Sequence, residues 1–228
     1  MNTPEIDDDL ETPLPPRKGD ILFRGDLPDG MNNACLNVMR DGDPIAYMEG
    51  YRRSALLLVK HVMESCRDQD FLVYPIIFLY RHHIELVLKR TIVRSTYIIE
   101  RSLTDEEKKH LGKHQIDLLW QDLKPILSAV WDETDIDDIE GIDSYISQLS
   151  MLDPDSFSFR YTHSRGGVRS LPENLKHINL RHFAEMMERL ADCLDGIDEG
   201  TGELLQAKAE METEWRNEMA QYMDYYEG

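Results

Sequence analysis

The residues best suited to chemistry lie in one segment, residues 157–167, which reads FSFRYTHSRGG. It places Arg160, His163 and Arg165 among aromatic residues that include Tyr161. Arginine binds phosphate through paired N–H groups, histidine exchanges protons near neutral pH, and aromatic rings stack on bases. Metal-independent RNA cleavage needs an acid or base and a cation for the charge that develops on the phosphate. We therefore expect Arg160 and His163 to be the catalytic candidates, with Tyr161 and Arg165 as ligand-binding residues.

The same segment also fits a purely structural role. Gly166 and Gly167 make it a flexible loop, and the rings of Phe157 and Phe159 are suited to plugging into a helical bundle. The sequence leaves both interpretations open.

A second polar cluster interrupts the most apolar part of the chain. Residues 81–90 read RHHIELVLKR and follow the apolar run 71–80. Arg81, Glu85 and Lys89 are four residues apart and therefore share one face of a helix. Charges on such a helix need a partner, because burying an unpaired charge is costly.

Three interpretations fit this charged face. It is a ladder of salt bridges within the helix on a partly exposed face, a polar seam in a homodimer, or a ligand site in which Arg81 or Lys89 binds phosphate while Glu85 orients it. His82 lies beside the face, and His83 points toward the core. His114 begins a later apolar helix.

Metal and cofactor motifs are missing. His110 and His114 are four residues apart, but Gly112 lies between them and no HExxH motif occurs. The sequence contains no P-loop, no GxGxxG and no GxSxG. We therefore expect neither a metal nor a cofactor.

Helical periodicity dominates the elements that must position these residues. The class is expected to be all-α, an antiparallel helical bundle with an extended or disordered N-terminal arm and a C-terminal helix. Asp70 is the expected N-cap of the second helix, Thr104 and Glu107 form a capping box, and Pro125 should kink or split its helix. The predicted helices span about residues 44–66, 71–101, 115–130, 135–149, 175–194 (or 179–194) and 203–225.

Composition divides the 228 residues into three parts: an N-terminal arm (1–43), a helical domain (44–197) and an acidic C-terminal helix (198–228). The three cysteines are odd in number and far apart, and the N-terminus lacks an apolar signal region. The longest apolar run is too short to span a bilayer. We expect a cytoplasmic protein with no membrane contact.

Charge is distributed unevenly. The formal net charge of −19 repels polyanions at long range. Residues 131–155 contain nine acids and no Lys or Arg, whereas residues 156–182 contain five Lys or Arg, three His and one acid. This basic island permits a local site for an anion.

Three motifs together resemble the HEPN superfamily of small all-α domains. They are R-H-x-x-E-L-x-L-K from Arg81, H-x-x-D-L-L from His114, and the pair Arg160–Tyr161. Each motif is loose, and their order and spacing carry the resemblance, which covers about residues 47–194.

The resemblance implies a helical bundle that dimerises and contacts RNA or a nucleotide, in a toxin–antitoxin, phage-defence or nucleotidyltransferase-partner system. Active members are metal-independent ribonucleases that use an Arg-x4–6-His motif. Arg160 and His163 match it with the shorter spacing Arg-x-x-His. An alternative mapping uses Arg81, Glu85, Lys89 and His114. Inactive members act as binding or assembly modules, so a non-catalytic dimeric interaction module is the alternative function.

Overall fold

The computed structural model describes residues 15–23, 25, 30–36, 42–131, 139–164 and 166–227, with side chains up to residue 223. The chain divides into two compact units, residues 1–40 and 41–228. In the first unit the structure describes one short 3-10 helix, η1 (Gly30–Asn32). The side-chain amide of Asn33 donates to the carbonyl of Gly25 at 3.0 Å. The first fourteen residues of the predicted arm lie outside the described residues.

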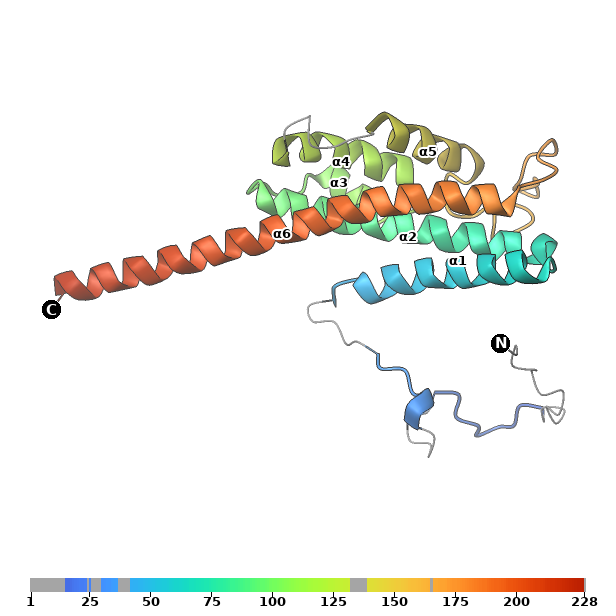
Figure 1. Cartoon of the computed structure of the whole chain (residues 1–228), viewed down its shortest axis with the longest axis horizontal. Helices are drawn as coiled ribbons and strands as arrows, with labels where there is room; N and C mark the ends of the chain where they lie inside the picture. The colour runs from blue at the N-terminus through green and yellow to red at the C-terminus, as the bar shows by residue number, and fades with distance from the viewer. Residues whose placement is uncertain are drawn as a thin grey trace. The chain divides into compact units, whose positions relative to one another are not determined.

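The second unit is a bundle of α-helices, which confirms the all-α prediction. Among its described residues, the only β-type pairing is an isolated bridge between His163 and Arg169. Figure 1 shows α2 at the centre, with α1 on one side and the shorter helices on the other, while α6 crosses the bundle. The helices are α1 (Ile45–Ser65), α2 (Gln69–Ile98), α3 (Asp105–Leu111), α4 (Ile116–Val130), α5 (Ile139–Leu152) and α6 (Leu180–Glu227).

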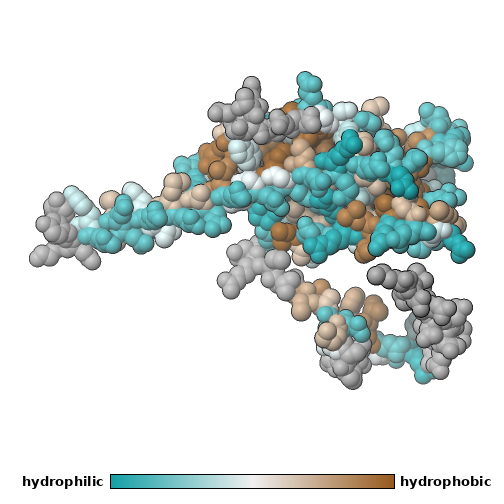
Figure 2. Space-filling view, viewed as in Figure 1, coloured by the Kyte–Doolittle hydropathy of each residue, from teal (hydrophilic) through white to brown (hydrophobic). Residues whose placement is uncertain are grey.

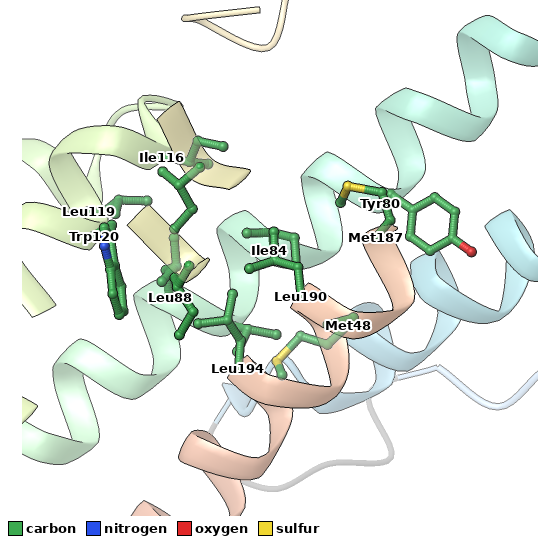
Figure 3. Packing of buried hydrophobic residues seen from close by; sticks show 14 of the residues in the cluster. Met48, Tyr80, Ile84, Leu88, Ile116, Leu119, Trp120, Met187, Leu190 and Leu194 are labelled. Carbon is green, nitrogen blue, oxygen red and sulfur yellow. The ribbon is translucent and has the colours of Figure 1, made fainter. Parts of the chain in front are cut away.

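Helix α2 is central because it is apolar on several faces, and a helix of that kind is stable only when neighbours cover it. Its side chains pack against α1, α4 and α6 at the same time (Figure 3). By length and composition α2 could also cross a membrane, and half of its most apolar stretch is buried; the core helix of a soluble protein meets the same criterion. The core includes Met48, Tyr80, Ile84, Leu88, Ile116, Leu119, Trp120, Met187, Leu190 and Leu194.

The prediction of two separate helices at the C-terminal end of the chain was wrong, because both belong to one helix. Helix α6 runs without interruption for 48 residues, so the expected boundary at residue 198 falls inside it. Gly200 and Gly202 lie within this helix, where a Cβ on Gly200 would meet Trp131 at an ordinary contact distance of 3.6 Å and one on Gly202 would lie 3.3 Å from the Arg94 guanidinium. Asp198 also binds α6 to α2, since its carboxylate lies 3.2 Å from Arg94.

Local signals at helix ends were partly confirmed. Thr104 and Glu107 form the predicted capping box at the start of α3. The N-cap of α2 is Asp68, in the left-handed region at φ 64°, and not Asp70. Pro125 does not split α4, which continues from Ile116 to Val130; Pro125 is exposed, and Leu123 and Leu127 are buried in the core.

Candidate functional site

Arg81 is completely buried and joins three parts of the chain. Its Nη2 donates to the carbonyl of His114 at 2.5 Å and to that of Pro154 at 3.3 Å. Its Nε donates to the carbonyl of Asp153 at 3.1 Å, and the Asp153 carboxylate lies 3.4 Å away. Arg81 therefore connects α2 to the turn before α4 and to the loop after α5.

Glu85, one turn further along α2, is the acceptor at the centre of this cluster and is 1% exposed. Its Oε1 lies 2.8 Å from Lys89 Nζ and 2.8 Å from His114 Nδ1, and its Oε2 lies 3.4 Å from Arg81 Nη1. Burial alone would raise the pKa of Glu85, but interactions with His82, Lys89 and His114 lower that pKa to about 2. The carboxylate is therefore ionised near neutral pH.

These contacts match the predicted ladder of salt bridges within the helix, with the turn before α4 added to it. Arg81 and Glu85 lie inside the bundle of a single chain, so they are not part of the surface that a second subunit or a ligand could reach. The accessible members are His114, with 55% of its side chain exposed, Lys89 with 22% and His82 with 21%. Any ligand or second subunit at this face would contact these three residues. As expected, His83 is in the core, where its Nδ1 lies 3.1 Å from the carbonyl of Met48.

Aromatic rings extend the cluster along α2. The His82 ring stacks on Phe78, with the ring centroids 5.6 Å apart, and meets the edge of Tyr51 at 4.4 Å. The guanidinium of Arg160 also lies over the Phe78 ring, 5.3 Å from its centroid. The motif that begins at Arg81 and the segment that contains Arg160, 79 positions further on, thus meet at one face of α2.

Arg160 is held with its terminal nitrogens available. Its Nε donates to the carbonyl of Ser156 at 2.5 Å, and its guanidinium lies 5.7 Å from the ring of Tyr161. Among the described residues, no hydrogen bond occupies Nη1 or Nη2. An arginine fixed through Nε and flanked by rings can offer both terminal nitrogens to a phosphate.

The loop that carries Arg160 is anchored at its start. The Oδ1 atom of Asp153 accepts from the backbone N–H groups of Phe157 at 2.6 Å and Ser158 at 2.7 Å. Phe159 is 6% exposed, so the structural interpretation holds for this ring. Further along, the backbone N–H of Ser164 donates to the carbonyl of Val168 at 2.7 Å and forms a tight turn.

A pocket of about 640 Å³ is lined by residues 158–163 of this loop, by residues 169–173, 175 and 176 that follow it, and by Tyr74 of α2. Arg160 and His163, the two predicted catalytic residues, both line it. His163 is exposed, and its Nδ1 lies 3.1 Å from the Thr162 hydroxyl. Unlike His114, it has no carboxylate to orient its ring among the described residues. Arg165 lies outside the described residues.

Sequence reasoning missed four residues of this face. Tyr74, 46% exposed, and Arg169 and Lys176 line the pocket, whose one acid is Glu173. The ring of Phe78 packs against the guanidinium of Arg160. Two sequence signals pointed to these residues: Arg169 and Lys176 belong to the basic island, and Tyr74, Phe78 and His82 are spaced four residues apart. Neither signal indicated which of these residues would lie together in the folded chain.

A second hollow, of about 660 Å³, lies between α4 and α5. Its one cation, Lys124, binds both carboxylate oxygens of Asp143, at 2.9 and 3.0 Å. This pairing neutralises the lysine and makes the hollow less suited to an anion than the Arg160 pocket.

In the described part of the chain, no group of three or more His, Cys, Asp or Glu side chains is arranged to hold a metal ion. Comparison of the chain with protein-family models, curated proteins and solved structures finds no match.

Proposed function

We propose that this chain is a HEPN-like cytoplasmic protein that binds RNA or a nucleotide in the Arg160 pocket. One observation carries the proposal: a protein with a net charge of −19 gathers Arg160, His163, Arg169 and Lys176 around one cavity beside half-exposed tyrosines. The resemblance supports RNA as the ligand and a role in a defence or toxin–antitoxin system.

The pocket offers the two kinds of contact that a short nucleic acid needs. Arg160 presents Nη1 and Nη2 to a phosphate, and Arg169 and Lys176 add positive charge. Tyr74 and Tyr161, 46% and 53% exposed, offer rings on which a base stacks. The acidic remainder of the protein repels longer polyanions, which favours a short single strand or a mononucleotide.

We further propose that the pocket cleaves RNA without a metal, because the acid–base candidate and the phosphate-binding candidate line the same cavity. His163 takes the proton of a ribose 2′-hydroxyl, and the 2′-oxygen forms a bond to phosphorus. The bond to the 5′-oxygen breaks, and that oxygen leaves with a proton from solvent, so the products are a 2′,3′-cyclic phosphate and a 5′-hydroxyl. Arg160 stabilises the charge on the phosphate oxygens.

The test separates binding from cleavage. A fluorescein-labelled RNA oligonucleotide is titrated with wild type, Arg160→Ala and His163→Ala in EDTA, with anisotropy for binding and gel electrophoresis for cleavage. Arg160→Ala should bind at least about tenfold more weakly, because a charge-assisted hydrogen bond is lost. His163→Ala should bind normally and not cleave.

The matched control is Arg53→Ala, which removes an exposed arginine of α1 that pairs with Glu49. It should bind and cleave as wild type does. Equal binding by Arg160→Ala and wild type contradicts the binding site, and equal cleavage by His163→Ala contradicts the catalytic assignment.

The second candidate is a non-catalytic dimeric module. It is favoured by the accessible His82, Lys89 and His114, which rest on buried Glu85 and form a fixed polar surface. Light scattering should then report a dimer for wild type and a monomer for Lys89→Glu. A monomer in both samples contradicts this candidate.

A further inference from the structure

Helix α6 continues far beyond the bundle. Lys208 links α6 to the end of α2 and to the residues just after it: its Nζ donates to the carbonyl of Ile98, the last residue of α2, at 3.1 Å and to Glu100 Oε1 at 2.7 Å. Beyond this point α6 extends past the ends of the other helices of the bundle to Glu227 (Figure 1). Its surface there is mostly hydrophilic, with hydrophobic residues at intervals (Figure 2).

Those intervals follow a helical period. Met211, Trp215 and Met219 are four residues apart, so their side chains lie along one face of α6. Their exposed fractions are 62%, 63% and 42%. Single exposed apolar residues are ordinary, but an aligned row of methionine and tryptophan is typical of a surface that another helix covers. We call these three residues the α6 stripe.

Acidic residues flank the α6 stripe on both sides. With a helical turn of 100° per residue, Glu212 lies on one side of Trp215 and Glu214 and Glu218 lie on the other. Residues 209–223 contain four glutamates and a single cation, Arg216. A second copy of this helix would bring like charges together along the seam, which disfavours self-pairing.

We propose that the α6 stripe is the docking surface for a basic amphipathic helix of a partner protein. The partner's apolar residues would pack on Met211, Trp215 and Met219, while its Lys or Arg residues would pair with the flanking glutamates. Tryptophan is enriched among residues that dominate binding energy, and methionine adapts to partners of different shape.

The docking surface is remote from the Arg160 pocket. Met211 lies 31 positions after the start of α6 at Leu180, which corresponds to about 45 Å along the helix axis. A partner on the α6 stripe therefore leaves the pocket open, and this inference does not depend on the proposed RNA function.

The test uses the full chain and a synthetic peptide of three Leu-Lys-Lys-Leu-Leu-Lys-Leu heptads, labelled with fluorescein. An otherwise identical peptide with glutamate in place of each lysine is the charge control. The chain variants are Trp215→Ala, the double variant Glu212→Gln/Glu214→Gln, and Asn217→Ala as a matched change on the opposite face of the helix.

The basic peptide should bind wild type, shift its tryptophan emission to the blue and bind more weakly as salt rises, while the acidic peptide should not bind. Trp215→Ala should weaken binding by about tenfold or more, and the double glutamine variant by a few-fold with a smaller salt dependence. Asn217→Ala should bind as wild type does. All three variants should show unchanged thermal unfolding, because their side chains lie outside the bundle.

Three results would overturn the proposal. They are equal binding of the two peptides, equal affinity of Trp215→Ala and wild type, and self-association of the chain that light scattering detects and Trp215→Ala abolishes. The last result would identify a second copy of this chain as the occupant.

Discussion

Glu85 Oε1 lies 2.8 Å from His114 Nδ1, although 29 positions separate the two residues. Because the pKa of Glu85 is lowered to about 2, the carboxylate is ionised and can only accept, so Nδ1 carries the proton. The other ring nitrogen, Nε2, has no partner among the described residues. A buried acid thus fixes the orientation of an exposed histidine on the same α2 face as Arg160.

Replacing Arg81 should destabilise the bundle strongly. Arg81→Met leaves Glu85 and Asp153 buried beside a neutral side chain and removes the hydrogen bonds to three backbone carbonyls. We expect a loss of about 3–5 kcal/mol in the free energy of unfolding, measured by urea denaturation. Arg53→Met, which breaks an exposed pair with Glu49, should change it by less than about 1 kcal/mol. Similar effects from the two variants would show that the buried cluster does not hold the bundle together.

The contribution of Glu85 should depend on pH in a specific window. Its folded-state pKa is about 2 against a reference value of 4.5, so its ionised form stabilises the fold fully above about pH 4.5 and loses that contribution as the pH falls toward 2. Wild type should therefore exceed Glu85→Gln in unfolding free energy by on the order of 3 kcal/mol at pH 7. The difference should shrink between pH 4.5 and 2, as followed by thermal unfolding of both proteins. A difference that stays constant from pH 7 to pH 3 contradicts the assignment.

The contribution of the α3 capping box to the free energy of unfolding should be measurable with a single substitution. Thr104 Oγ1 accepts from the backbone N–H of Glu107 at 3.2 Å, and the Glu107 carboxylate accepts from the backbone N–H of Thr104 at 2.7 Å. Thr104→Ala should lower the free energy of unfolding by about 1 kcal/mol in urea denaturation. Ser128→Ala, an exposed position within α4, is the control and should have little effect.

The salt dependence of RNA affinity should be proportional to the number of pocket cations that contact phosphate. With three phosphate contacts, from Arg160, Arg169 and Lys176, the logarithm of the association constant should fall with the logarithm of salt concentration with a slope of about −2. Lys176→Gln should reduce the magnitude of that slope by about 0.7 while leaving cleavage chemistry intact. Anisotropy titrations at several salt concentrations give both slopes, and an unchanged slope would remove Lys176 from the site.

Much of the fold follows from local patterns. The 3.6-residue period of apolar residues was enough to predict an all-α bundle and the apolar core helix, and the Thr104–Glu107 spacing was enough to predict a helix start. Local patterns failed where packing overrides propensity. The thin apolar stripe after residue 203 was predicted as a helix separate from 175–194, yet α6 is continuous, and Asp198, between the two predicted helices, is paired with Arg90 and Arg94 of α2.

The candidate site was predictable in its parts and not in its assembly. Periodicity shows that Arg81 and Glu85 share a face of α2, because side-chain direction in a helix depends only on position along it. It cannot show that the turn at His114 and the loop at Asp153 cover that face, since these contacts join residues 29 to 72 positions apart. Only the tertiary structure therefore showed that Arg81 and Glu85 are buried within one chain, and only it placed Arg160 over Phe78.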